Sequence, residues 1–237
     1  MVDIRVVSLK YSERRSSFSL DRLKYDFFDA VEGDSESTFN ENLAMLIYGR
    51  KLRRGEIGCT LSHYNLAKMH SNSNEDWLCV LEDDATIKDN LVELINNLPA
   101  KDSIAKILLL GHSKTREQDL IIQRLKQPLN NKCVISGVEF GESKVNFCGT
   151  VGYVINKSAA KIIAKQDSVF WLADDFNVLS NMGIKVLHPS IPLVYEDLRY
   201  VSTTGNEITY YHSIKEHFFH NVYVVFKSQI KRLLGKL

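Results

Sequence analysis

Short apolar runs alternate with helical segments along most of the chain. The runs are rich in β-branched and aromatic residues, as strands are, and they span residues 4–9, 27–31, 77–81, 104–110, 147–155 and 184–195. Helical spacing of apolar residues or capping residues mark the segments 52–69, 89–98, 156–163 and 176–183. This alternation predicts an open α/β sheet, in which ligands bind at the carboxyl ends of the strands.

Two stretches fit this pattern less well. Residues 34–42 are polar and predict a surface loop. Residues 112–144 are polar and variable, and their pattern indicates no role.

Three acids follow the most apolar of the predicted strands. Glu82, Asp83 and Asp84 come directly after residues 77–81, and three carboxylates cannot be buried together without a compensating cation. Side chains alternate along a strand, so Glu82 and Asp84 share one face if the strand continues that far. The hypothesis is a Mg²⁺ or Mn²⁺ site that holds a phosphate-bearing substrate. The alternative is a solvated acidic turn before the helix at 89–98.

Polar and basic residues also follow the first strand. Ser8 and Leu9 precede Arg14 and Arg15, so a nucleotide would find hydroxyl and guanidinium groups at this end of the sheet. The alternative is that Arg14 and Arg15 open a solvated helix.

The helical segment 52–69 carries two small residues one turn apart, Gly58 and Ser62. Small residues at this spacing allow either a planar ligand or a neighbouring strand to approach closely, and both alternatives stay open. His63 is either a ligand contact or a hydrogen-bonded structural histidine.

A second acidic pair, Asp174 and Asp175, follows Trp171 at the predicted start of an apolar helix. One aspartate suffices as an N-cap, which leaves the other as a general base or a sugar contact. His188, in the last predicted strand, is a further candidate metal ligand.

Composition narrows the class of protein. With 237 residues, of which 44% are apolar, the chain is expected to form one domain over residues 1–210, followed by a tail over 211–237. The 30 basic and 29 acidic residues give a net charge of +1, which does not indicate a nucleic-acid partner.

The four cysteines form no C-x-x-C pair, and Cys59, Cys79 and Cys148 are expected to be small core residues. No signal peptide and no apolar run of about 20 residues is found, so a cytoplasmic protein is expected.

The tail has a pattern of its own, with basic residues beside apolar ones at helical spacing. The apolar residues are Val222, Phe226, Ile230, Leu233 and Leu237, and the basic ones are Lys227, Lys231, Arg232 and Lys236. Such a helix either lies on an anionic membrane surface or packs on the domain with its lysines in solvent.

Taken together, six short motifs in this order resemble glycosyltransferase family 25, the family of bacterial lipooligosaccharide galactosyltransferases and animal collagen galactosyltransferases. The resemblance covers residues 2 to about 195. The motifs are Val7-Ser8-Leu9 with Arg14-Arg15, Phe28-Asp29-Ala30-Val31, Gly55-Glu56-Ile57-Gly58-Cys59 with Leu61-Ser62-His63, Leu81-Glu82-Asp83-Asp84, Gly149-Thr150-x-Gly152-Tyr153, and Asp174-Asp175-Phe176.

The resemblance implies a GT-A type fold, a Rossmann-like α/β sandwich with a central, mostly parallel sheet. It also implies an inverting transfer of a sugar, most often galactose, from a UDP-sugar to a hydroxyl of a lipooligosaccharide or lipopolysaccharide acceptor. Because such an acceptor is lipid-borne, the resemblance favours peripheral attachment of the tail to the cytoplasmic face of the inner membrane. The acidic triplet then stands where that fold has its Asp-x-Asp motif, although Glu82 replaces the first aspartate.

By the same resemblance, Asp84 is the ligand of a Mn²⁺ or Mg²⁺ ion, and Asp175 is the base, with Asp174 as the alternative. The donor-binding residues are Ser8, Leu9, Arg14, Glu56, Gly58, Ser62, Glu82 and Asp83. A metal-dependent nucleotidyltransferase or phosphohydrolase could use the same acidic strand end, and a carbohydrate-binding protein could keep the same fold.

Overall fold

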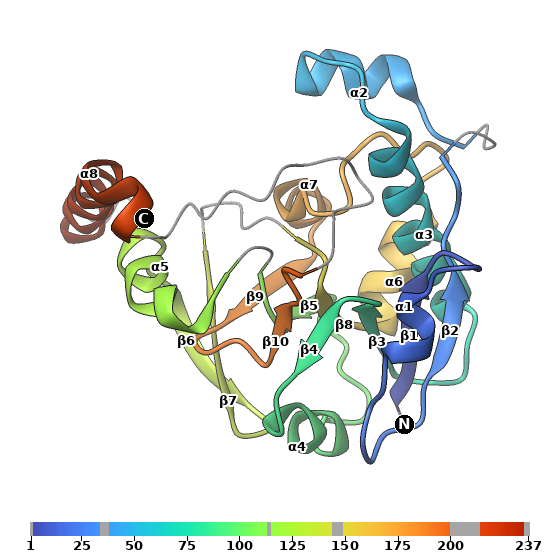
Figure 1. Cartoon of the computed structure of the whole chain (residues 1–237). Helices are drawn as coiled ribbons and strands as arrows, with labels where there is room; N and C mark the ends of the chain where they lie inside the picture. The colour runs from blue at the N-terminus through green and yellow to red at the C-terminus, as the bar shows by residue number, and fades with distance from the viewer. Residues whose placement is uncertain (1, 34–37, 113–114, 144–148, 200–213, 235–237) are drawn as a thin grey trace.

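The computed structural model (Figure 1) describes residues 2–33, 38–112, 115–143, 149–199 and 214–234. The strands are β1 (Val2–Ser8), β2 (Asp26–Asp29), β3 (Trp77–Glu82), β4 (Ala85–Ile87), β5 (Lys106–Leu109), β6 (Asn130–Ile135), β7 (Val138–Glu142), β8 (Gly152–Asn156), β9 (Lys185–Pro189) and β10 (Val194–Glu196). The helices are α1 (Arg14–Ser17), α2 (Glu41–Tyr48), α3 (Arg54–Ser71), α4 (Asn90–Asn96), the 3₁₀ turn η1 (Glu117–Asp119), α5 (Leu120–Lys126), α6 (Lys157–Ala164), α7 (Phe176–Asn181) and α8 (Ile214–Leu233).

An eight-stranded sheet runs through the molecule in the order β2-β1-β3-β8-β5-β9-β7-β6. The pairs of β1 with β2, β1 with β3 and β5 with β9 are parallel, whereas β8 and β7 run antiparallel to each neighbour. Strands β2, β1, β3, β5, β9 and β6 therefore point the same way. The predicted α/β sandwich with a mostly parallel sheet is confirmed.

The central strand β3 is buried on both faces, which explains its unbroken apolar sequence. Leu78 and Val80 point into the core layer beneath α3 and α6. Trp77, Cys79 and Leu81 point into the opposite layer, which includes residues of α4. Alternate side chains of β3 thus pack into two separate core layers. The carboxyl end of β3, which carries the acids, lies between these layers.

Helix α3 lies very close to the segment that follows β2. A Cβ atom on Gly58 would lie 2.3 Å from the carbonyl oxygen of Val31. Ser62 is fully buried, and its Oγ donates to the Gly58 carbonyl at 2.7 Å and accepts from the Val31 N–H at 2.8 Å. The contacts of Gly58 and Ser62 are therefore those of a tightly packed helix.

Several boundaries differ from the sequence-based expectation. Residues 184–195 form two strands rather than one, because the chain leaves the main sheet after Pro189 and pairs β10 with β4 in a separate two-stranded sheet. Residues 112–144 include α5 and the hairpin β6–β7, which extends the main sheet at one edge. The predicted loop at 34–42 ends in the cap of α2, and its residues 34–37 lie outside the described residues.

A helix does occupy the predicted tail. It begins at Ile214, and it packs against α5 (Figure 1). Among the described residues, no helix combines the length and apolar character needed to cross a membrane.

Candidate active site

The carboxyl ends of β1 and β3 lie side by side and bring two polar segments together. The strands are parallel, with Val7 opposite Glu82. The Ser8 hydroxyl donates to Asp83 Oδ2 at 2.6 Å, and the Ser12 hydroxyl donates to the same oxygen at 3.0 Å. Asp83 therefore anchors the segment that follows β1.

Arg14 joins this segment to the acids. One terminal nitrogen of its guanidinium group lies 3.2 Å from Asp83 Oδ1 and 3.2 Å from Asp84 Oδ2, and all three side chains are largely buried. The neighbouring Arg15 contacts the Ser8 carbonyl and Asp29 instead. Of the two arginines at this strand end, Arg14 is thus the one placed against the acidic triplet.

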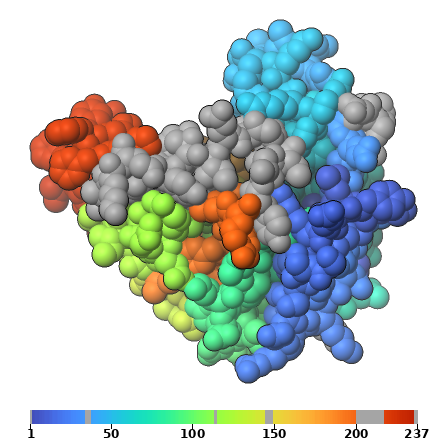
Figure 2. Space-filling view, viewed as in Figure 1, coloured from blue at the N-terminus to red at the C-terminus, as the bar shows by residue number. Residues whose placement is uncertain are grey.

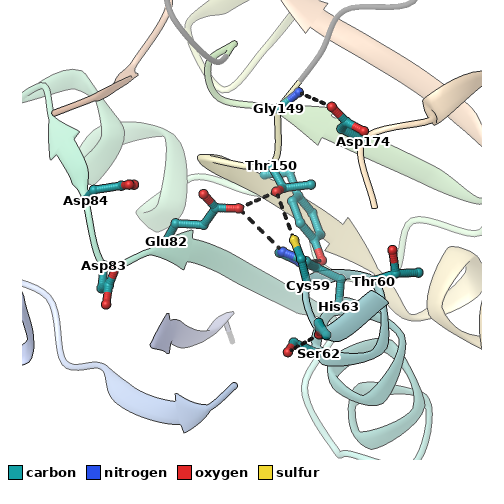
Figure 3. A network of polar contacts seen from close by, with 12 residues as sticks. Cys59, Thr60, Ser62, His63, Glu82, Asp83, Asp84, Gly149, Thr150 and Asp174 are labelled. Atoms are coloured by element: carbon teal, nitrogen blue, oxygen red, sulfur yellow. Dashed lines mark hydrogen bonds and ion pairs between the residues drawn. The ribbon is translucent and has the colours of Figure 1, made fainter. Parts of the chain in front are cut away.

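The strand β3 ends at Glu82, so the three acids do not alternate as strand residues. Glu82 reaches toward Thr150 and His63, Asp84 projects from the turn toward the same space, and Asp83 points away from both (Figure 3). The expectation that Glu82 and Asp84 share a strand face depended on a longer strand, so the turn, and not strand alternation, sets their positions.

Asp84 is the least compensated of these acids. Its Oδ1 is buried and has no hydrogen-bond partner among the described residues. Burial raises the pKa of Asp84 to about 8, and the charges of Glu82 and Glu196 add to this effect, while Arg14 opposes it. A buried, unpaired carboxylate oxygen among like charges fits a divalent cation with oxygen ligands, in which waters and substrate phosphates complete the coordination. Asp84 could therefore hold the expected Mn²⁺ or Mg²⁺.

Glu82 lies in a different environment, against α3 and the segment before β8. It accepts a hydrogen bond from the Thr150 hydroxyl, and its Oε1 lies 3.7 Å from Nε2 of His63. Burial acts to raise the pKa of Glu82, but the interactions with His63, Thr150 and Arg14 outweigh it and hold the pKa below its usual value. Glu82 is therefore an ionised, compensated carboxylate.

Two further residues complete this cluster. Cys59 is partly buried, and its Sγ lies 3.9 Å from Thr150 Oγ1. It was expected in the core, but only Cys79 lies there among the described cysteines, and Cys148 lies outside the described residues. The Tyr153 hydroxyl lies 3.0 Å from Nδ1 of His63. Burial raises the pKa of both the Cys59 thiol and the Tyr153 phenol.

The second acidic pair lies at the start of α7. Asp174 Oδ2 accepts from the Gly149 N–H at 3.2 Å (Figure 3), and burial raises the pKa of Asp174, with Glu82 adding to the effect. Asp175 is the N-cap residue of α7, but its side chain makes no cap hydrogen bond. Instead, Asp175 Oδ2 accepts from the Tyr48 hydroxyl at 2.8 Å. The sequence predicted that one aspartate caps the helix and leaves the other free, but the Asp175 side chain at the cap position contacts Tyr48 instead of the helix backbone.

The remaining predicted site residues have other surroundings. Glu56 completes a capping box at the start of α3 and pairs with Arg50 through both carboxylate oxygens, at 2.7 and 2.8 Å. Leu9 is exposed beyond the end of β1. His188 is buried, with its Nδ1 3.2 Å from Nε2 of His112, and burial lowers its pKa to about 4. The donor contacts of Glu56, Gly58, Ser62 and Leu9, and a metal role for His188, stay predictions.

Sequence reasoning missed the partners of the acids. Ser12, Tyr48, Thr150 and Tyr153 each contact a site residue, although Thr150 and Tyr153 lie in a glycine-containing motif that was singled out. Thr150 is 68 positions from Glu82 and Tyr48 is 127 positions from Asp175, and no periodicity in the sequence links positions so far apart.

Comparison with known proteins identifies the chain's relatives. The lipooligosaccharide biosynthesis protein lic2B of Haemophilus influenzae is 27% identical over 169 residues, which cover 66% of this chain and 60% of that protein. Procollagen galactosyltransferase 1-B of Xenopus laevis is 32% identical over 47% of this chain and 21% of its own length. The lipooligosaccharide biosynthesis protein lex-1 of Haemophilus influenzae is 28% identical over 48% of this chain and 37% of its own length.

The chain spans at most 60% of the length of each of these curated relatives. Residues 1–178, which contain both acidic sites, match the model of glycosyltransferase family 25, described as an LPS biosynthesis protein family. The chain belongs to glycosyltransferase family 25.

Proposed function

We propose that this glycosyltransferase moves a sugar, most often galactose, from a UDP-sugar to a hydroxyl group of a lipooligosaccharide or lipopolysaccharide acceptor, with inversion at the anomeric carbon. The observation that carries the proposal is the buried, unpartnered oxygen of Asp84 at the carboxyl ends of β1 and β3. The relatives named for lipooligosaccharide biosynthesis and for galactosyl transfer support the acceptor and the sugar.

On the donor side, Asp84 is proposed to hold Mn²⁺ or Mg²⁺, which when bound supplies Lewis-acid stabilisation of the charge that develops on the departing diphosphate. Arg14 lies against Asp83 and Asp84 and adds positive charge at the same place. Ser8 and Leu9, at the end of β1, are proposed to contact the nucleotide.

On the acceptor side, Asp175 is proposed to remove the proton from the attacking hydroxyl. The Tyr48 hydroxyl fixes one of its oxygens, which leaves the other carboxylate oxygen to accept the proton. UDP leaves without protonation by an acid, so a single base is sufficient for the inverting reaction.

The first test is a UDP-release assay of the purified protein with a panel of UDP-sugars and a glycan acceptor. We expect metal-dependent release with one UDP-hexose. Asp175→Asn should lower kcat by about 1,000-fold, which lies within the usual contribution of a general base, and should leave donor affinity unchanged. Asp174→Asn is the matched control. Near-normal turnover of Asp175→Asn would refute its role as the base, and a loss of turnover in Asp174→Asn instead would assign that role to Asp174.

Helix α8 supports a second part of the proposal, peripheral contact with an anionic membrane. The side chains that α8 buries, among those described, are polar: Asn221 accepts from Lys126 Nζ at 2.9 Å and Ser228 donates to the Lys126 carbonyl at 2.7 Å. Most of the large apolar side chains of α8 are exposed instead, namely Phe218, Phe219, Val222, Tyr223, Phe226, Ile230 and Leu233.

This arrangement reverses the usual packing of an amphipathic helix on a domain. Helix α8 stands at one end of the molecule (Figure 2), and Lys227, Lys231 and Arg232 accompany its exposed apolar residues. An anionic bilayer surface offers both an apolar layer and negative charge, and it would accommodate both features.

The test is sedimentation with vesicles of phosphatidylglycerol and phosphatidylcholine. We expect binding that weakens with salt and that falls at least tenfold in the Phe219→Ser/Phe226→Ser variant, since both side chains are exposed. Tyr11→Ser, which removes another exposed aromatic side chain, should bind like the unmodified protein. Removal of residues 222–237 should abolish binding, and equal sedimentation of that variant would refute the membrane contact.

A further inference from the structure

Three potential metal ligands of different chemistry meet between α3 and the end of β3. Cys59 and His63 lie one helical turn apart on α3, and Glu82 ends β3 (Figure 3). One ligand atom from each residue, a thiol sulfur, an imidazole nitrogen and a carboxylate oxygen, lies within 4.8 Å of the other two.

His63 is oriented for ligation by its other ring nitrogen. The Tyr153 hydroxyl lies 3.0 Å from Nδ1, a contact that fixes the ring plane, as outer partners of metal-bound histidines do. The side chain is 8% exposed, and its Nε2 is buried without a hydrogen-bond partner among the described residues.

The separations leave room for an ion. Nε2 of His63 lies 3.7 Å from Glu82 Oε1, which is too long for a hydrogen bond. Two ligands at about 2.0–2.1 Å from a tetrahedral zinc ion lie about 3.3 Å from each other, and a sulfur at about 2.3 Å lies about 3.5 Å from a nitrogen. The cluster therefore needs to contract by only a few tenths of an ångström along the His63–Glu82 direction.

Thr150 has the position of an outer-shell residue. Its hydroxyl donates to Glu82, and the same oxygen lies 3.9 Å from Cys59 Sγ. It thus contacts two of the three candidate ligands and fixes the carboxylate, as the hydrogen-bond partners of metal ligands do.

We propose that Cys59, His63 and Glu82 form a binding site for a borderline-soft divalent cation of the Zn²⁺ class, separate from the oxygen-ligand site at Asp84. Thiolate and imidazole ligands favour Zn²⁺ over Mg²⁺ or Mn²⁺, which take oxygen ligands. Three protein ligands leave a fourth position open, the pattern of zinc sites that also bind water or substrate. This site is inferred from these contacts and does not depend on the proposed transferase reaction.

The test uses the full chain freed of metals by a chelator and then titrated with Co²⁺. We expect one equivalent to bind with the near-ultraviolet thiolate-to-cobalt charge-transfer band, and we expect Zn²⁺ to displace it. Zn²⁺ affinity, measured by competition with a chromophoric chelator, should fall about 100-fold or more in Cys59→Ser and in His63→Gln. Thr150→Val should lose about tenfold, as second-shell changes usually do.

Cys133→Ser is the matched control, because Cys133 is also a partly exposed free cysteine but lies in β6. Alkylation of the unmodified protein gives a measurement that needs no variant to fold, since Zn²⁺ should slow modification of the Cys59 peptide and leave the Cys133 peptide unaffected. A missing charge-transfer band, a band that survives Cys59→Ser, or alkylation of Cys59 that is indifferent to Zn²⁺ would each overturn the proposal. None of these readouts depends on turnover, so a failed transferase assay leaves the result interpretable.

Discussion

Glu82 and Asp84 are two residues apart, yet they lie in opposite electrostatic surroundings. The pKa of Glu82 is held low because His63, Thr150 and Arg14 compensate its charge against the effect of burial. The pKa of Asp84 is raised to about 8 because burial and the like charges of Glu82 and Glu196 outweigh Arg14. The acids of this triplet are therefore not equivalent, since the pKa of each carboxylate depends on the residues that surround it.

The largest expected effect separates the two carboxylates by their role in metal binding. Asp84→Ala should weaken Mn²⁺-dependent binding of UDP by about 100-fold or more, because it removes the proposed metal ligand. Isothermal titration with and without Mn²⁺ measures it, and Glu82→Gln, whose carboxylate faces α3, should retain most of the metal dependence. Affinity that is the same with and without Mn²⁺ in the unmodified protein would contradict the assignment.

The next effect concerns stability. Arg14→Gln should destabilise the fold by about 2 kcal/mol. This is less than the usual cost of breaking a buried ion pair, because the side chains are partly exposed. The substitution leaves Asp83 and Asp84 without their shared cation. Urea unfolding measures the change. Arg15→Gln, whose partner Asp29 is more than half exposed, should cost less, and a larger loss there would show that Arg14 is not the main stabilising charge.

The raised pKa of Asp84 also predicts a dependence of stability on pH in the metal-free protein. An unfolded aspartate has a pKa near 4, so the folded protein retains a proton that the unfolded chain releases between about pH 4 and the folded value of about 8. Stability should therefore fall as the pH rises through this window, by at most about 1.4 kcal/mol per pH unit, and should level off above it.

The clearest range for this measurement is pH 6.5 to 8. The buried His70 and His188 have folded pKa values of about 4, so their contribution is lost on acidification below about 6.5, with the opposite slope. Thermal or urea unfolding at several pH values should show the decline in the unmodified protein and a flatter profile in Asp84→Asn. Equal slopes for the two proteins would refute the raised pKa.

The smallest effect tests whether the two carboxylates influence each other. Glu82→Gln removes one of the like charges that raise the pKa of Asp84, so the pKa of Asp84 should fall by about one unit or less. Carboxyl-carbon NMR titration of the metal-free protein measures it, with Glu139→Gln as an exposed control. An unchanged pKa would show that the charge of Glu82 does not contribute to the raised pKa of Asp84.

The sequence predicted the parts of the molecule that depend on local pattern. The apolar run at residues 77–81 predicted a strand, and β3 occupies Trp77–Glu82. The polar and acidic residues that follow the strands were expected at the end of the sheet where ligands bind, and Arg14 contacts Asp83 and Asp84 at that end.

The parts that depend on tertiary contacts were not predictable in this way. The strand β3 ends at Glu82, before the other two acids, and an alternating pattern cannot show where a strand ends. The hairpin β6–β7 has half-exposed strands at the sheet edge, so it lacks the strong apolar alternation by which strands are recognised. The close approach of Val31 to Gly58 joins residues 27 positions apart, and no local pattern indicates it.

One hydroxyl group connects two segments that are distant in the chain. The Tyr48 oxygen, at the end of α2, accepts from the Leu172 N–H at 3.0 Å and donates to Asp175 at 2.8 Å. Replacing Tyr48 with phenylalanine would keep the ring but leave a backbone donor and a carboxylate without their shared partner. The orientation of the proposed base therefore depends on a helix more than 100 positions earlier. An insertion or deletion that shifts α2 would disturb Asp175, whereas the contact of Asp84 with Arg14 does not involve α2.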